Sequence, residues 1–220
     1  MKSPPPLLLA LSVACAAVFT LFVARPIAGD LPVLLKVTSI VLLMLLGFRI
    51  HWALGMALAF SAIGDWLLGV RRLGSLAEQS LFLFGLGAFL IAHLFYIGLF
   101  QKHRALPEFR RNPGRIAAAV AILLAMGGVL ILLFPNLGPL SVPVVVYAGV
   151  LCSMGISAQM AGLNNSYAAI GALLFIASDA SIAIAKFHGA FPGDRLFIWI
   201  TYYLAQWLIL RGFQTNADPD

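Results

Sequence analysis

Long uninterrupted apolar runs constrain this chain more than any other feature of its sequence. A helix rises about 1.5 Å per residue, so about 20 residues cross the ~30 Å hydrocarbon core of a bilayer. Strands of a membrane barrel would instead alternate apolar and polar side chains over about ten residues. The runs therefore predict an all-α polytopic membrane protein with eight transmembrane helices in one bundle. The expected helices are 6–24, 31–49, 52–70, 81–100, 116–134, 140–160, 167–187 and 196–213.

Composition supports the membrane and argues against other classes. Hydrophobic residues make up 62% of the chain and charged residues 10%, whereas about a quarter of a soluble domain is charged. The net charge of +6 would suggest nucleic acid in a soluble protein, but here Lys and Arg lie mostly between the apolar runs. They are interpreted as topology signals and contacts with membrane lipids, and no nucleic-acid partner is expected. The segments between the apolar runs are too short to fold alone, which predicts a single domain over 1–220.

The distribution of basic residues predicts the orientation. The side of the bundle that holds both termini carries Lys2, Arg49, Lys102, Arg104, Arg110, Arg111, Arg115 and Arg211. The opposite side carries Arg25, Arg71, Arg72, Lys186 and Arg195. Because basic residues concentrate on the cytoplasmic side, both termini are expected there, in the inner membrane if the source is bacterial.

Two carboxylates lie inside the apolar runs. Of the eight acidic residues, only Asp65 and Asp179 are not in loops or at the C-terminus. Each costs about 2.5–3.5 kcal/mol to place in a membrane helix, so both are expected to face the bundle interior at a functional site. A structural ion pair between these acids and Lys36 is the alternative. Lys36 could also extend to the interface.

A count of helical rise places these groups at one height. Asp65 lies six residues and Asp179 seven before the basic residue that ends its run, which is roughly 9 to 10 Å below the outer helix ends. Lys36 and Tyr202 lie at roughly 8 and 9 Å by the same rise. The sequence therefore predicts one polar layer from four helices.

Other polar residues could bind substrate or tune the two acids, although packing and helix-to-helix hydrogen bonds are their ordinary roles. They are Lys36, Ser61, His93, Tyr96, Tyr202 and Gln206. The cations expected at the rim, where they could meet a phosphate, are Arg71, Arg72, Lys186 and Arg195. No His, Cys and carboxylate cluster has the spacing of metal ligands, so no metal and no cofactor are expected.

Four segments resemble the lysoplasmalogenase family of YhhN-like membrane proteins. They are ALAFSAIGDWLLG at 57–69, LFGLGAFLIAHLFYIGLF at 83–100, GALLFIASDASIAIAKF at 171–187 and YYLAQWLILRG at 202–212. Lys36 also falls where a lysine is expected in that family. The resemblance implies hydrolysis of the vinyl-ether bond of a lysophospholipid, to a fatty aldehyde and glycerophosphoethanolamine or glycerophosphocholine. It implies Asp65 and Asp179 as the catalytic pair.

The residues suit this chemistry. Vinyl-ether hydrolysis needs an acid that protonates the alkene carbon and an anion that stabilises the resulting cation or activates water. Two neighbouring carboxyls do not both ionise easily, so one would donate the proton and the other stay a carboxylate. Lys36 would fix which one stays ionised. The sequence favours Asp179 as the anion without deciding the question.

Other functions share some of these features. A proton-coupled transporter also places carboxylates between helices, but it favours the midplane and broken helices. An intramembrane peptide hydrolase would use two aspartates as well, yet Ala62 stands where its GxGD pattern begins with glycine. Hydrolysis of another lipid and a non-catalytic lipid-binding role are further alternatives. Chain preference and oligomeric state are not encoded in any pattern of this sequence.

Overall fold

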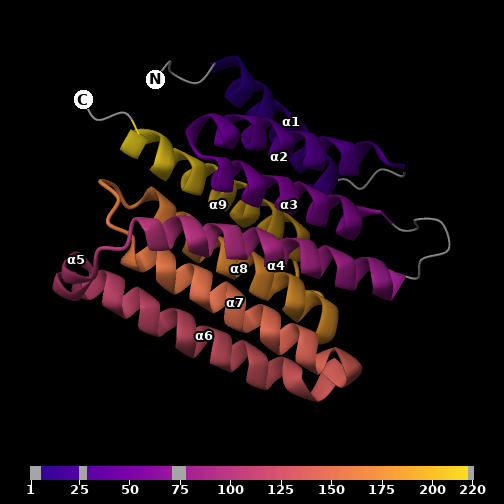
Figure 1. Ribbon diagram of the computed structural model, residues 1–220. Helices are drawn as coiled ribbons and strands as arrows, with labels where there is room; N and C mark the ends of the chain where they lie inside the picture. The colour runs from indigo at the N-terminus through magenta and orange to yellow at the C-terminus, as the bar shows by residue number, and fades with distance from the viewer. Residues whose placement is uncertain (1–5, 25–28, 71–77, 218–220) are drawn as a thin grey trace. The chain divides into compact units, whose positions relative to one another are not determined.

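The protein is all-helical in the part of the chain that the computed structural model describes, residues 6–24, 29–70 and 78–217 (Figure 1). Within these ranges the only extended pairing is an isolated bridge between Arg104 and Ala161. The helices are α1 (Pro6–Ala24), α2 (Leu31–Ile50), α3 (Trp52–Gly69), α4 (Glu78–Lys102), α5 (Leu106–Arg111), α6 (Pro113–Leu137), the 3₁₀ helix η1 (Gly138–Leu140), α7 (Ser141–Met160), α8 (Tyr167–Phe187) and α9 (Asp194–Ala217).

Each predicted apolar run coincides with one helix, and the differences lie at the ends. The loop after α4 contains the short helix α5, which the apolar pattern did not predict because its six residues are too few for an apolar run. α6 continues through Pro135, where a break was expected, and ends at Leu137 with Gly138 as its C-cap. Gly138 has a φ of 50°, a conformation that glycine adopts without the penalty of a Cβ.

The chain divides into two compact units, Met1–Tyr96 and Ile97–Asp220, and each is described by itself. The first contains α1, α2, α3 and most of α4, and the second contains the remaining helices. The prediction of a single domain stays a prediction.

In the first unit, α2 and α3 form a tight helical hairpin. Only His51 separates them, and its Nδ1 accepts a hydrogen bond of 3.0 Å from the backbone N–H of Ala53, which caps α3. A Cβ on Gly47 would lie 2.8 Å from a methyl of Leu58 and 3.2 Å from the backbone nitrogen of Gly55. Small residues therefore let the two helices approach closely, as is typical of packing in membranes.

In the second unit, α8 and α9 pack backbone to backbone. A Cβ on Gly171 would lie 2.8 Å from the carbonyl oxygen of Ala205, and one on Gly212 would lie 2.8 Å from the backbone nitrogen of Ala168. The hairpin of α6 and α7 closes over a buried cluster of Leu133, Leu137 and Val144. Ala183, Ile184 and Phe187 of α8 pack against that cluster.

Six stretches of the described residues are long and apolar enough to cross a membrane. One of them, Pro113–Met160, includes both α6 and α7, while the apolar helix Leu7–Val23 within α1 is shorter than the six. The all-α class is confirmed and the chain is a multi-pass membrane protein. The count of eight spans stays a prediction.

Candidate functional site

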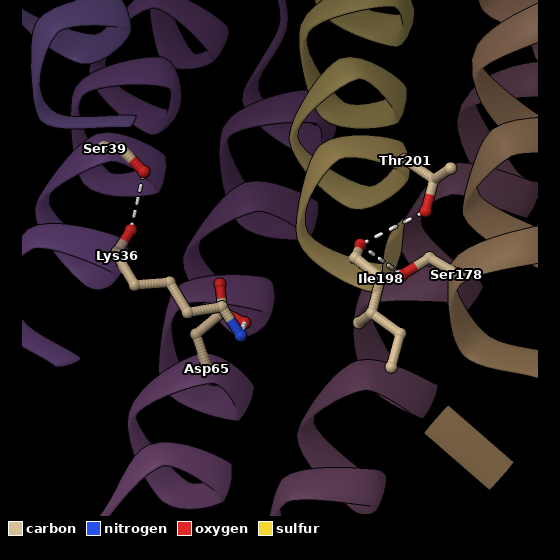
Figure 2. Close-up of polar contacts among 6 residues, drawn as sticks. All are labelled: Lys36, Ser39, Asp65, Ser178, Ile198 and Thr201. Carbon is tan, nitrogen blue, oxygen red and sulfur yellow. Dashed lines mark hydrogen bonds and ion pairs between the residues drawn. The ribbon is translucent and has the colours of Figure 1, made fainter. Parts of the chain in front are cut away.

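A buried ion pair joins α2 to α3 in the first unit. Nζ of Lys36 lies 2.8 Å from Oδ1 of Asp65, and the two side chains are 23% and 1% exposed. Figure 2 shows the lysine side chain extending from α2 to the aspartate on α3. Lys36 lies five residues after the start of α2 and Asp65 four before the end of α3, so both are roughly 6 to 8 Å from the same end of the hairpin. Lys36 therefore pairs with an acid instead of extending to the interface.

Serine hydroxyl groups near this pair donate hydrogen bonds to backbone carbonyls, and one of these bonds joins two helices. The Ser39 hydroxyl donates to the Lys36 carbonyl at 2.7 Å, and the Ser12 hydroxyl donates to the Ser39 carbonyl at 2.8 Å, which ties α1 to α2. Ser61 is wholly buried one turn before Asp65, but its hydroxyl donates within α3, to the Ala57 carbonyl at 2.9 Å. These bonds satisfy polar groups that lipid could not.

In the second unit, a phenol meets the other buried acid. The Tyr147 hydroxyl of α7 donates a hydrogen bond to Oδ2 of Asp179 on α8, and both residues are buried. Tyr147 was not among the predicted site residues, because it lies outside the four segments that resemble the lysoplasmalogenase family. The depth count would have found it, since Tyr147 lies roughly 9 Å from the start of α7 and Asp179 roughly 12 Å from the adjacent end of α8.

The neighbour of Asp179 fixes α8 to α9. Ser178 donates to the Ile198 carbonyl at 3.0 Å, and Thr201 approaches the same oxygen at 3.2 Å (Figure 2). Thr201 makes its shorter bond, 2.6 Å, to the Phe197 carbonyl. Because Ser178 precedes Asp179 directly, this contact restrains the backbone that carries the acid.

The remaining predicted site residues, which are Tyr202, Gln206, His93 and Tyr96, are buried. Tyr202 lies edge-on to Phe175, with ring centroids 5.5 Å apart. Gln206 is one turn further along α9 and wholly buried. His93 and Tyr96 are wholly buried in α4, in the first unit. A role for any of the four in binding or tuning stays a prediction, as does the expected meeting of Asp65 with Asp179.

The structure describes two of the four cations predicted at the rim. Lys186 at the end of α8 and Arg195 at the start of α9 are exposed. Arg71 and Arg72 lie outside the described residues. Among the residues that the structure describes, no three His, Cys, Asp or Glu side chains gather as metal ligands would.

The helices and their buried acids define a multi-pass α-helical membrane protein with polar sites inside its spans. Residues 31–213, which include both aspartates, match the model of the YhhN family, and the chain belongs to that family. No solved structure matches the chain.

Curated relatives come from bacteria and mammals. A protein of Mycobacterium tuberculosis (strain CDC 1551 / Oshkosh) named lysoplasmalogenase is 40% identical over 169 residues, which is 74% of this chain and 61% of the relative. Human lysoplasmalogenase TMEM86A is 33% identical over 172 residues, 74% of this chain and 65% of that protein. Rat lysoplasmalogenase TMEM86B is 30% identical over 203 residues, 90% of this chain and 79% of that protein. The match thus spans about three fifths of the mycobacterial protein's length.

Proposed function

We propose that this chain is a membrane hydrolase that cleaves the vinyl-ether bond of lysoplasmalogens. The products would be a fatty aldehyde and glycerophosphoethanolamine or glycerophosphocholine. One observation carries the proposal: relatives that are 30–40% identical are named lysoplasmalogenase. The two aspartates buried in membrane helices within the family match support it. Buried ionisable groups in such helices are costly and are functional by default.

The two aspartates would act as acid and anion. One carboxyl protonates the alkene carbon that is not bonded to the ether oxygen, which leaves an oxocarbenium ion at the carbon that is. The other carboxylate stabilises that cation and takes a proton from the attacking water. The hemiacetal then collapses to the aldehyde and the glycerol hydroxyl. Ser61, His93, Tyr96, Tyr202 and Gln206 are proposed to line the substrate's path or tune the acids.

The depth of the Lys36–Asp65 pair is compatible with a lysolipid substrate. A lysolipid holds its vinyl ether just below the head group, and this pair lies roughly 6 to 8 Å inside the helix ends. A membrane-embedded acid at that height could reach the bond without extracting the lipid.

The cations predicted at the rim are proposed to bind the head group of the substrate. Lys186 and Arg195 are proposed to contact the substrate phosphate, together with Arg71 and Arg72. Replacing Lys186 and Arg195 together by Gln is expected to raise KM several-fold with little change in kcat. The phosphate contact should contribute the same binding free energy in the ground state and in the transition state. The measurement is initial rate against lysoplasmalogen content in mixed micelles. A lowered kcat at unchanged KM would contradict the assignment.

We also propose eight spans in one domain, with both termini in the cytoplasm. A straight helix of 48 residues, the length of Pro113–Met160, would measure about 72 Å, more than twice the bilayer core. η1 lies between α6 and α7 at the point where the chain would reverse.

In a cysteine-free background, Asn112→Cys and Asn136→Cys should react with an impermeant maleimide from opposite faces of sealed vesicles. Asn112→Cys should react from the cytoplasmic face. Labelling of both cysteines from the same face would reject the eight-span topology.

The function itself is tested with three lysolipids that differ only at the chain linkage: vinyl ether, saturated ether and ester. Purified protein should release aldehyde from the vinyl ether alone. Release of fatty acid from the ester would indicate hydrolysis of another lipid. No turnover, combined with proton-dependent uptake in liposomes, would select a transporter.

A further inference from the structure

Basic residues gather in the segment that joins α4 to α6. From Lys102 to Arg115 the chain carries five basic residues and a single acidic one, Glu108. Figure 1 shows the short helix α5 of this segment between the end of α4 and the start of α6. The whole segment belongs to the second unit. It is the densest group of basic residues in the sequence.

Backbone hydrogen bonds fix this segment to the end of α7. The N–H of Ala105 donates to the Met160 carbonyl at 2.9 Å. The His103 carbonyl accepts a bond of 2.7 Å from the N–H of Gly162. The two bonds flank Arg104 on either side along the chain. The segment therefore has a defined shape at this end of the second unit, which a free loop would not have.

The side chains of the segment divide into an inner and an outer set. The Arg115 guanidinium is half-buried and donates to the Ala161 carbonyl at 2.7 Å, so it stabilises the fold. Leu106 and Phe109 are also half-buried, and they share one face of α5 at positions i and i+3. The other four basic side chains are exposed and together form what we call the basic surface: Lys102, Arg104, Arg110 and Arg111.

We propose that the basic surface binds the head groups of anionic phospholipids in the adjoining leaflet. Cations held on one ordered segment repel one another, and anions that approach from outside relieve this repulsion. Because α4 and α6 are both long and apolar enough to cross a membrane, lipid phosphates are the anions closest to the segment. Clusters of four or more Lys and Arg next to a membrane span are typical of sites for anionic lipid.

The ordered shape of the segment favours binding over a topology signal alone. A topology signal requires only that basic residues follow a span on one side of the membrane, whatever their arrangement. Here backbone bonds to α7 hold the segment in place, and α5 turns an apolar face inward and leaves Arg110 and Arg111 exposed. A short helix with one apolar and one basic face is the arrangement by which proteins contact the surface of a membrane.

The basic surface lies at the opposite end of the second unit from Asp179. α8 begins at Tyr167, shortly after α7 ends at Met160 beside the segment. Asp179 lies twelve residues further along α8, roughly 18 Å by the helical rise. Lys186 and Arg195 lie beyond it, at the other end of α8 and the start of α9. The lipid at the basic surface is therefore not the proposed substrate, and its binding does not depend on the proposed hydrolysis.

The test compares two lipids that differ in net charge. Purified protein on a solid support is equilibrated with detergent micelles that contain isotope-labelled phosphatidylglycerol, which is anionic, or phosphatidylcholine of the same chains, which is zwitterionic. The wild-type protein should bind phosphatidylglycerol at least several-fold more tightly, and the preference should weaken as salt rises, because salt screens exposed charges. Equal affinity for the two lipids would overturn the proposal.

Replacing Arg110 and Arg111 together by Gln assigns the binding to this surface. Each lost cation should weaken binding of phosphatidylglycerol about fivefold, and the pair roughly 25-fold, with phosphatidylcholine unaffected. Arg110→Lys with Arg111→Lys is the matched control; it keeps both charges and should bind within about twofold of wild type, since Lys and Arg contribute alike near a charged membrane. Unchanged binding in the Gln pair, or an equal loss in the Lys pair, would overturn the proposal.

Glu108→Gln gives a change of the opposite sign, which a loss of structure would not imitate. Glu108 is exposed in α5, and removing its charge should strengthen binding of phosphatidylglycerol about fivefold. Inorganic phosphate, added at constant ionic strength, should not displace the lipid. Displacement by phosphate would show a site for small anions instead of a lipid surface, and the absence of any gain in Glu108→Gln would show that charge does not drive the binding.

Discussion

Asp65→Asn and Asp179→Asn should each lower aldehyde release by roughly 10²- to 10⁴-fold, the usual contribution of a general acid or base. Asparagine keeps the shape of aspartate but can neither donate the acid proton nor carry the negative charge. The measurement is aldehyde formation by purified protein with the vinyl-ether lysolipid. Because both side chains are buried in the membrane helices, each variant is first checked for a single peak in size exclusion and for cooperative thermal unfolding.

Asp30→Asn is the matched control for these two variants. Asp30 precedes α2, is exposed, and makes no side-chain capping bond. Its replacement makes the same chemical change without touching a buried acid, so activity should stay within about twofold of wild type, as for surface substitutions generally. A folded Asp65→Asn or Asp179→Asn protein that retains wild-type activity would remove that residue from the mechanism.

Lys36→Met is expected to produce the largest loss of stability. The change leaves Asp65, which is 1% exposed, without its ammonium partner. Breaking a buried pair by removing one member costs about 3–5 kcal/mol, because the remaining charge is uncompensated. The free energy of unfolding is measured by denaturant titration in detergent. Adding Asp65→Asn to Lys36→Met should recover most of the loss, since neither member of the pair then carries a charge.

Lys102→Met tests whether loss of a lysine alone has this effect. Lys102 is exposed at the end of α4, and exposed ion pairs contribute about 0 to 1 kcal/mol. Its unfolding free energy should therefore stay within about 1 kcal/mol of wild type. Lys36→Met could instead lose as little unfolding free energy as this control, or the double variant could be no more stable than Lys36→Met. Either result would show that Lys36 and Asp65 are not coupled as a buried ion pair.

The apolar runs determined the helices because their signal is local and additive. Each run of about 20 residues specifies a helix whatever its neighbours do, since backbone groups in lipid must bond within the segment. The exceptions involve short or special elements. α5 has too few residues for an apolar run. Pro135 predicted the end of a helix, but α6 continues through it and ends just before Gly138.

For the site, the sequence by itself determined which residues are too polar for their surroundings, and roughly how deep they lie. Asp65, Asp179 and Lys36 were identified in this way. Only the tertiary structure decided that Lys36 reaches Asp65 and that Tyr147 donates to Asp179. The physical reason is that lipid is as apolar as a helix interface, so the apolar pattern does not encode which face of a span turns inward. That rotation is set by contacts from other helices, such as the close approach of α9 at Gly171.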